Sequence, residues 1–290
     1  MNENLQGKTI VISGATSGIG LATARMVVQR GGNVIGIGRS AERCEKVKRQ
    51  LAMINPQVMI EMCVADLSLQ SEIRTLRPQI EQFMQQHSIQ GLDGLVNNAG
   101  TFTYWLTLTP EGFEMQWAVN HLAPFLLSHT LLPLLMDAPQ ARIVTVSSGS
   151  HYQGRMYWDD LQLRRHYNGL LAYQNTKLAN VLFTQAFNRR MGPQSRVKAF
   201  AADPGLVKTE IGLKGNPALV GWVWKRRRAG GTPPEVPARG IVYLLTDEAV
   251  QTSEEIYWKD SKPKKASKRA LNAADADRLW AESEKMCGMI

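Results

Sequence analysis

The sequence is poor in cysteine and has no arrangement of side chains typical of a metal site. Cys44, Cys63 and Cys287 form an odd and widely scattered set among 290 residues. Such a set argues against a disulfide framework and a zinc site, and it indicates a reducing compartment. The five histidines show no metal-ligand spacing either. We therefore expect a cytoplasmic protein without a metal centre.

Long hydrophobic runs are also missing. The first eight residues are polar and lack the basic flank and apolar core of a signal peptide. A membrane span needs roughly 18 apolar residues. The nearest candidate, 122–136, is interrupted by Pro124, Pro133 and several polar side chains. The sequence thus predicts neither a secretory signal nor a membrane-spanning helix.

The composition is that of an ordinary globular protein. Hydrophobic residues make up 44% and charged residues 20%, which excludes disorder of the whole chain. No linker or internal repeat divides the sequence, so we expect one domain over residues 1–290. The formal net charge of +9 leaves three kinds of partner open: nucleic acid, an anionic membrane surface or an anionic ligand.

Apolar β-branched runs alternate with longer amphipathic stretches along most of the chain. The predicted strands are 9–13, 33–38, 58–65, 92–96, 142–147, 197–202 and 255–258. The predicted helices are 19–30, 41–54, 69–87, 110–135, 171–191, 235–247 and 273–286. This alternation predicts an α/β Rossmann fold, a doubly wound parallel sheet of about seven strands with helices on both faces.

A glycine-rich turn joins the first strand to the first helix. Gly14, Gly18 and Gly20 have the spacing G-x-x-x-G-x-G. Glycines let a pyrophosphate approach the helix N-terminus, where free N–H groups favour an anion. The strand–turn–helix context predicts a dinucleotide site, and a tight turn without a ligand is the alternative. The other candidate contacts within the turn are Thr16, Ser17 and Ile19.

The end of the second strand indicates which dinucleotide is bound. A carboxylate there would bind the ribose 2′-hydroxyl of NAD, but the sequence has Gly38 followed by Arg39. We expect Gly38 to leave room for a phosphate and the planar guanidinium of Arg39 to bind it. NADP(H) is therefore favoured and NAD(H) stays open, while the alternative for Arg39 is a solvated residue at a helix cap.

Two further strand ends carry candidate cofactor contacts. Asp66-Leu67 closes the third strand, where a side chain would meet the adenine amino group. The run 97–100 closes the fourth strand, and its small residues let the backbone approach a ribose. Asn97 has a structural alternative, which is to tie neighbouring strands together. The remaining candidates in this run are Asn98, Ala99 and Gly100.

Taken together, these motifs resemble the short-chain dehydrogenase/reductase family over nearly the whole chain. The resemblance rests on Gly14/Gly18/Gly20, Asp66, Asn97–Gly100, Asn120, Ser148, Tyr173-x-x-x-Lys177 and Pro204-Gly205. Ser13 is a small departure, since the family usually has Thr there. Closer likeness to the retinol-dehydrogenase-like branch comes from 158–162, 173–183 and 203–209. Membrane-bound members of that branch have an N-terminal anchor, which we do not find here.

Tyr173 and Lys177 share one face of a predicted helix, because they are four residues apart. A nearby ammonium and the oxidised nicotinamide favour phenolate, so Tyr173 can exchange a proton with an alcohol or carbonyl. Ser148 would hold the substrate oxygen, with Ser147 as the competing serine. The resemblance also places Tyr173 and Lys177 at the nicotinamide ribose, and it assigns Asn120 a water that links Lys177 to solvent.

The segment after the sixth strand is expected to complete the cofactor site. Main-chain groups of Val207 would bind the nicotinamide carboxamide, and the Thr209 hydroxyl would reach the pyrophosphate, next to the Pro204-Gly205 turn. An insertion at about 155–168 separates Ser148 from Tyr173 and must loop out so that they meet. A substrate lid is expected at about 211–232, where an apolar run containing Trp222 and Trp224 either lines the pocket or packs elsewhere.

Two basic clusters, Lys225–Arg228 and Lys259–Arg269, contain much of the excess positive charge. A solvated face and a peripheral membrane contact are both open for the first cluster. Direct nucleic-acid recognition is not expected, since no nucleic-acid-binding motif is present. His151 lies near the expected site, where a surface role is favoured over contact with the substrate.

We therefore expect an NADP(H)-dependent oxidoreductase acting on an apolar carbonyl or alcohol of retinoid, steroid or lipid-aldehyde type. The alternative is a non-catalytic dinucleotide-binding redox sensor or scaffold, which would have no need of Tyr173. The sequence leaves the substrate, the direction of reaction and the choice between monomer and homo-oligomer open.

Arg39→Asp tests the assignment of the 2′-phosphate. Exchanging the cation for an acid should shift the preference from NADP(H) toward NAD(H), because a carboxylate repels the phosphate and accepts a bond from the 2′-hydroxyl. The KM values for both cofactors measure the change. An unchanged ratio would contradict the assignment.

Overall fold

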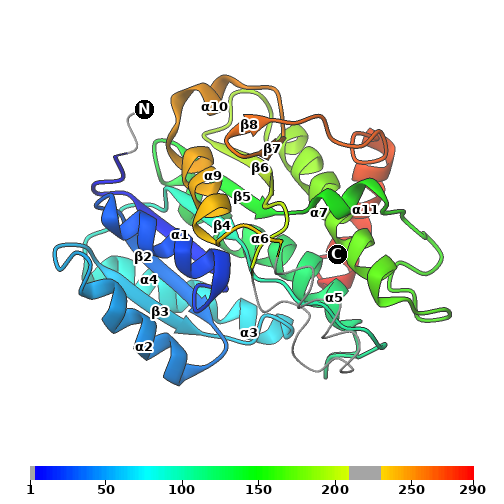
Figure 1. The fold of residues 1–290 in the computed structure, drawn as a ribbon, viewed down its shortest axis with the longest axis horizontal. Coiled ribbons are helices and arrows are strands. Elements are labelled where there is room, and N and C mark those ends of the chain that lie inside the picture. The colour runs from blue at the N-terminus through cyan, green and yellow to red at the C-terminus, as the bar shows by residue number, and fades with distance from the viewer. Residues whose placement is uncertain (1–3, 209–229) are drawn as a thin grey trace.

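The strands form one sheet that is parallel except at one edge. The computed structural model describes residues 4–208 and 230–290, and within them eight strands pair in the order β3-β2-β1-β4-β5-β6-β7-β8 (Figure 1). Only β8 runs antiparallel, against β7. The strands are β1 Thr9–Ser13, β2 Asn33–Gly38, β3 Ile60–Val64, β4 Gly94–Asn97, β5 Ala141–Val146, β6 Val197–Asp203, β7 Tyr257–Lys259 and β8 Lys262–Pro263.

The predicted doubly wound parallel sheet is confirmed. About seven strands were expected, and β8 is the additional one, because a strand of two residues leaves no periodic pattern in the sequence. The strand order reverses between β1 and β4. In such folds ligands bind at this switch point, outside the carboxyl ends of the strands.

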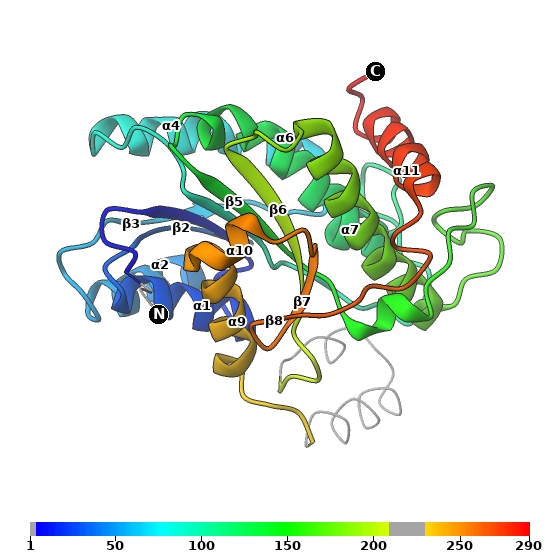
Figure 2. The same cartoon turned by 90° about the horizontal axis from the view of Figure 1, so that it is seen from above.

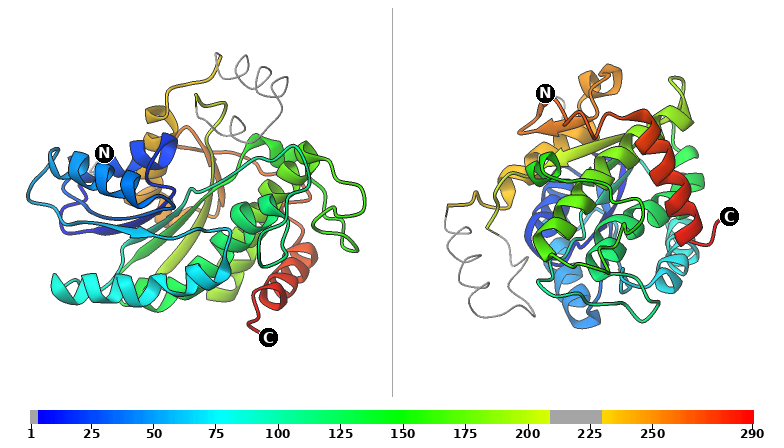
Figure 3. Two further views of the ribbon diagram at one scale, coloured as in Figure 1. Left: turned by 90° about the horizontal axis from the view of Figure 1, so that it is seen from below. Right: turned by 90° about the vertical axis from the view of Figure 1, so that its right-hand side faces the viewer.

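Helices cover both faces of the sheet (Figure 2). One face carries α1 (Gly18–Gln29), α2 (Ala41–Ala52) and α9 (Glu235–Thr246). The other carries α4 (Leu76–Gln86), α6 (Ala123–Met136) and α7 (Gly169–Met191), and α11 (Ala273–Met286) packs on the outer side of α7 (Figure 3). The short segments are α3 (Gln70–Arg74), α5 (Met115–Trp117), α10 (Glu248–Thr252), the π-helix η1 (Ala118–Leu122) and the 3-10 helix η2 (Gly149–Tyr152).

Side chains of successive strand residues alternate between two cores. Ile10 and Ile12 of β1 belong to the core beneath α1 and α9, whereas Val11 between them belongs to the core beneath α6 and α7. All five residues of β1 are buried, as expected for a strand covered on both faces. The sheet therefore gives the carboxyl ends of its strands a rigid base.

Two predicted helices differ from the structure. The predicted helix 69–87 divides into α3 and α4 just before Pro78, which has no N–H to donate to the Arg74 carbonyl. The predicted helix 110–135 begins only at Met115, since Gly112, with φ +82°, belongs to a preceding turn. It then continues through η1 into α6. The continuity of the first predicted helix and the start of the second were wrong, because local backbone constraints override the periodic pattern.

By length and composition, one helical stretch among the described residues, Met115–Met136, could cross a membrane. In the structure, 67% of its most apolar window is buried inside the fold. Phe125, Leu126 and Leu131 are each at most 1% exposed and pack in the core beneath α7. The apolar side chains of this stretch therefore form part of the hydrophobic core.

Side-chain hydrogen bonds fasten the end of β1 to the end of β4. The Ser13 hydroxyl accepts bonds from the main-chain N–H groups of Asn98 (2.9 Å) and Ala99 (3.0 Å). The Asn98 amide donates in return to the Ser13 carbonyl at 2.9 Å. Asn97 donates to the hydroxyls of Ser128 (3.0 Å) and Thr145 (3.4 Å), so its side chain ties β4 to β5 and α6. The position of the glycine turn relative to β4 thus depends on one buried hydroxyl.

Ser13→Ala removes the acceptor of two main-chain N–H groups. We expect the free energy of unfolding to fall by about 1–3 kcal/mol, because the partly buried Ala99 N–H is left without a partner and the Asn98 N–H keeps only the Val96 carbonyl at 3.0 Å. Denaturation by urea measures this change. Ser13→Thr keeps the hydroxyl and is the matched control, whose stability should stay close to that of the natural protein. If Ser13→Ala were as stable as the natural protein, the hydrogen bonds of the Ser13 hydroxyl would contribute nothing to stability.

Candidate active site

The glycine turn forms a close-packed cradle at the N-terminus of α1. Gly14 and Gly18 have φ values of +67° and +54°, which side chains with a Cβ rarely adopt. A Cβ on Gly20 would lie 2.3 Å from the Gly14 carbonyl oxygen, so no larger residue fits there. The Ser17 side chain makes no capping bond to the first turn of α1. N–H groups without a side-chain cap at a helix N-terminus suit a pyrophosphate, so the cradle fits a dinucleotide.

Arg39 and Asp66 meet at the neighbouring strand ends. The Arg39 guanidinium lies 3.8 Å from the Asp66 carboxylate, and the Arg39 side chain is 74% exposed. The guanidinium is therefore accessible to an anion. The expectation that Gly38 leaves room for a phosphate is wrong, because a Cβ there would lie 2.6 Å from the Thr16 side chain and 2.7 Å from Cys44. The missing side chain instead lets β2 approach the glycine turn closely.

Tyr173, Lys177 and Ser148 come together although Ser148 lies 25 positions before the tyrosine. The Lys177 ammonium is 5.4 Å from the centre of the Tyr173 ring. It donates a hydrogen bond of 3.0 Å to the main-chain carbonyl of Val146, the last residue of β5. Tyr173 lies close enough to the Ser148 hydroxyl for that hydroxyl to lower its pKa, and Phe102 packs edge-on against its ring, with the ring centres 6.1 Å apart. The three groups thus lie together at the carboxyl end of β5.

The environment sets the charge of these groups. Burial raises the pKa of Tyr173 to about 12; the Asp203 charge adds to the rise, and the Ser148 hydrogen bond opposes it. Burial lowers the pKa of Lys177 to about 8. At neutral pH Tyr173 is therefore a neutral phenol that can donate a proton, and Lys177 is mostly an ammonium.

The two consecutive serines have different surroundings. The Ser147 hydroxyl is buried and donates to the Lys177 carbonyl at 2.8 Å, so it fastens α7 to the end of β5. Ser148 caps η2, where its hydroxyl accepts a bond from the Ser150 N–H at 3.1 Å and lies next to Tyr173. The geometry therefore favours Ser148 as the residue that meets a substrate oxygen.

Asn120 lies in η1 and connects two segments that flank Tyr173. Its side-chain oxygen accepts the Thr101 N–H at 2.7 Å. Its amide donates to the Thr101 carbonyl at 3.0 Å and to the Thr176 hydroxyl at 3.2 Å. Asn120 thus holds the loop after β4 against α7, and its water-mediated link to Lys177 stays a prediction.

The insertion 155–168 contains neither helix nor strand and returns the chain to the start of α7. Near its end, the Tyr167 hydroxyl lies 2.8 Å from the buried Glu114 carboxylate and 2.9 Å from both the Gln116 amide and the Thr103 hydroxyl. Burial raises the pKa of Glu114 and of Tyr167. Tyr167 therefore belongs to a structural hydrogen-bond network that joins the end of the insertion to Glu114, Gln116 and Thr103.

The Pro204-Gly205 turn follows β6, and Gly205 has φ +68°. Beyond it Val207 forms a β-bridge with Thr232, which brings the two ends of the intervening segment together. Thr209, the cluster Lys225–Arg228 and the expected lid up to residue 229 lie outside the described residues. Their predicted roles stay predictions.

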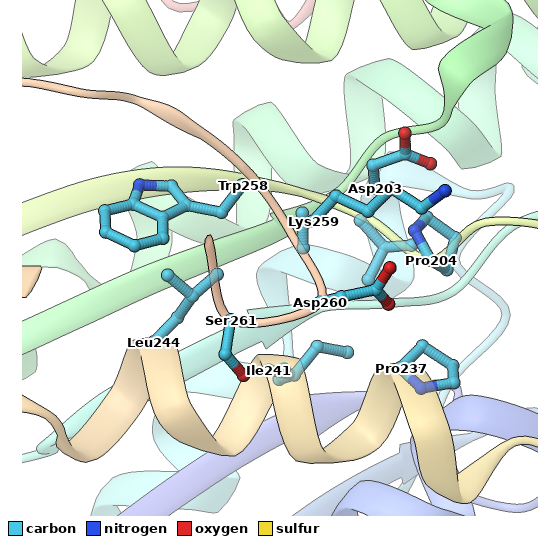
Figure 4. Close-up of a pocket in the computed structure, with 12 residues that line it drawn as sticks. Asp203, Pro204, Pro237, Ile241, Leu244, Trp258, Lys259, Asp260 and Ser261 are labelled. Carbon is cyan, nitrogen blue, oxygen red and sulfur yellow. The ribbon is translucent and has the colours of Figure 1, made fainter. Parts of the chain in front are cut away.

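The sequence analysis missed three residues around Ser148. His151 was expected at the surface, but it is fully buried: its Nδ1 contacts the Ser148 carbonyl at 2.9 Å and its Nε2 accepts the Ser267 N–H at 3.1 Å. The buried Asp203 carboxylate forms an ion pair with the partly exposed Lys264 ammonium, with a separation of 3.0 Å. In Figure 4 the Asp203 carboxylate points away from the small cavity that Ile241 and Trp258 line. Asp203 could have been suspected as a carboxylate at a strand end, but no sequence pattern indicated its partners.

Comparison with known proteins agrees with this geometry. A family model described as short chain dehydrogenase matches residues 8–218. Retinol dehydrogenase 14 from Homo sapiens is 34% identical over 305 residues, which cover 99% of this chain and 88% of that protein. Retinol dehydrogenase 11 from Homo sapiens is 34% identical over 287 residues, which cover 98% of this chain and 87% of that protein.

Solved structures show the same fold. The crystal structure of an uncharacterized protein from Mycobacterium Paratuberculosis has a TM-score of 0.75 and 31% identity, covering 98% of this chain and 95% of that chain. Angucycline C-6 ketoreductase with bound NADP has a TM-score of 0.70 at 23% identity, covering 89% of this chain and 95% of that chain. The chain therefore belongs to the short-chain dehydrogenase family, in its retinol-dehydrogenase-like branch, and is an oxidoreductase acting on CH–OH donors.

Proposed function

We propose that this protein transfers hydride between NADP(H) and the carbonyl or alcohol group of an apolar substrate, with Tyr173 as general acid and base. The observation that carries the proposal is the meeting of Tyr173 and Ser148, both partly buried, with the buried Lys177 ammonium at the carboxyl end of β5, on the sheet edge that also carries the glycine cradle. A module that only binds a dinucleotide has no use for a phenol placed beside a serine hydroxyl and a buried ammonium.

In the direction of reduction, the nicotinamide supplies the hydride when NADPH is bound. The hydroxyls of Ser148 and Tyr173 hydrogen-bond to the substrate carbonyl oxygen and orient it. Tyr173, a phenol at neutral pH, then gives its proton to the oxygen as negative charge develops there. The Lys177 ammonium stabilises the resulting phenolate, since it lies 5.4 Å from the ring centre. In the direction of oxidation the phenolate accepts the alcohol proton.

The preference for NADP(H) rests on Arg39. Its guanidinium is exposed at the end of β2, and no carboxylate stands at that strand end to bind a ribose 2′-hydroxyl. Asp66 beside it orients the guanidinium by their ion pair. A phosphate on the adenine ribose would meet a positive, planar donor there.

An apolar substrate is supported by the loop that follows Phe102. Tyr104, Trp105, Leu106 and Leu108 are exposed by 39–64%, and this loop lies against the start of α7, one turn before Tyr173. Exposed apolar side chains beside a catalytic group suit a hydrophobic ligand. The names of the relatives point in the same direction, because retinol is an apolar alcohol. We further propose a cytoplasmic location with peripheral contact to a membrane.

Tyr173→Phe tests the mechanism. Loss of the hydroxyl should lower kcat by about 10²–10⁴-fold, the usual contribution of a general acid, and should leave cofactor binding nearly unchanged. Oxidation of NADPH with a panel of aldehydes and ketones measures turnover, and fluorescence titration measures cofactor affinity.

Tyr157→Phe is the matched control, because Tyr157 lies in the insertion and is 38% exposed. Its turnover should equal that of the natural protein. Equal turnover of Tyr173→Phe and the natural protein would contradict the proposed role of Tyr173 and favour a non-catalytic binding module.

A further inference from the structure

We propose that Asp203 and Lys264 form a positioning pair for the active site: the Asp203 carboxylate fastens the Ser148 turn to the Gly205 turn, and the Lys264 ammonium cancels its charge toward Tyr173. This inference rests on the proposed function, because it assigns Tyr173 the proton transfer. Neither residue reaches the reacting atoms itself.

The Asp203 carboxylate joins two turns that are distant in sequence. One of its oxygens accepts the Gly149 N–H at 3.1 Å and the Gly205 N–H at 3.0 Å. Gly149 directly follows Ser148, and Gly205 lies in the turn expected to bind the nicotinamide end of the cofactor. A single oxygen at the end of β6 therefore sets the distance between the serine and the cofactor loop.

The other carboxylate oxygen is paired with Lys264, at 3.0 Å. The Asp203 side chain is only 3% exposed, whereas the Lys264 side chain is 36% exposed. The Lys264 ammonium also lies over the rings of Tyr152 (5.3 Å) and Tyr257 (5.8 Å). Its main-chain N–H donates to the Tyr257 carbonyl at 2.8 Å. Lys264 is thus held in place from β7, β8 and η2.

Few charged groups among the described residues act on Tyr173. Lys177 faces it from α7, Asp203 acts on it from β6, and Lys264 stands behind Asp203. Burial lowers the pKa of His151 on η2, and its Nε2 accepts the Ser267 N–H, so it is neutral. Tyr257 on β7 stays a phenol, because burial and Asp203 raise its pKa. Besides Lys177, the charges of Asp203 and Lys264 are therefore the ones that set the electrostatic environment of the Tyr173 hydroxyl.

Asp203 stays ionised because of its partners. Burial alone would raise its pKa, but the hydrogen bonds from Lys264 and Gly205 outweigh burial and lower it. An ionised Asp203 without its partner would oppose formation of the Tyr173 phenolate. The pair thus supplies one acceptor oxygen for two main-chain N–H groups, and Lys264 offsets part of the charge that this oxygen carries.

The two single charge removals should move the pH profile in opposite directions. In Lys264→Met no cation balances the Asp203 anion. The limb of the pH profile of kcat/KM that reports the titration of Tyr173 should therefore shift to higher pH by about 0.5–1 unit. In Asp203→Asn the amide oxygen still accepts both N–H bonds while the Lys264 cation is unpaired, so the limb should shift to lower pH. The double variant should return close to the natural profile.

A third substitution separates positioning from charge. Asp203→Ala leaves the N–H groups of Gly149 and Gly205 without an acceptor, so we expect kcat/KM to fall roughly tenfold further than in Asp203→Asn. Both kcat and the KM for NADPH should change, because the serine and the cofactor loop lose their common anchor. Lys265→Met, on the next and exposed residue, is the matched control and should leave the profile unchanged.

The decisive experiment is the pH dependence of kcat/KM for these variants, with thermal unfolding as a check of folding. Opposite shifts that cancel in the double variant support the pair. Shifts of the same sign, or an unmoved limb in folded Asp203→Asn and Lys264→Met while Tyr173→Phe is inactive, overturn it. If Lys264→Met does not fold, the sign of the shift in Asp203→Asn decides the matter alone. Failure of the proposed function differs, because Tyr173→Phe would then stay active.

Discussion

A reciprocal pair of hydrogen bonds between the end of β5 and α7 determines where the chemistry takes place. The buried Lys177 ammonium donates to the Val146 carbonyl, and the Ser147 hydroxyl donates to the Lys177 carbonyl. Burying an ammonium is unfavourable unless its hydrogen bonds are made. The helix α7 must therefore lie where the Lys177 ammonium reaches the Val146 carbonyl. Tyr173 lies one turn earlier on α7 and Ser148 one residue after Ser147. The positions of Tyr173 and Ser148 therefore depend on the hydrogen bonds that Lys177 and Ser147 make.

The cofactor side of the site depends on close steric fit. Gly14, Gly20 and Gly38 each lie where a Cβ would collide with the backbone or with a neighbouring side chain. Ser13 holds this turn to β4 through two main-chain N–H groups, and Asn97 holds β4 to β5. The same strands end at the cradle and at the catalytic group. A rigid sheet can therefore keep a nicotinamide and a phenol in register over a distance that loops alone would not maintain.

The excess of positive charge has more than one use. Lys177 is buried beside Tyr173, Arg39 is exposed at the end of β2, and Lys264 turns inward to a buried carboxylate. The basic stretch Lys259–Arg269 is thus not a uniform solvated face. The thiols contribute no charge at neutral pH, since burial raises the pKa values of Cys63 and Cys287 to about 12.

The sequence by itself determined the α/β fold, the parallel sheet and the glycine turn, because these depend on short-range periodicity and spacing; it singled out Tyr173 and Lys177 only together with the other motifs of the family it resembles. It left undecided what depends on contacts between distant segments. The choice between Ser147 and Ser148 needed the partner on α7, the burial of His151 needed Ser267 in the segment after β8, and the role of Asp203 needed Gly149 and Lys264. Only tertiary structure decides such contacts, because hydrogen bonds across 30 to 116 residues leave no local pattern in the chain.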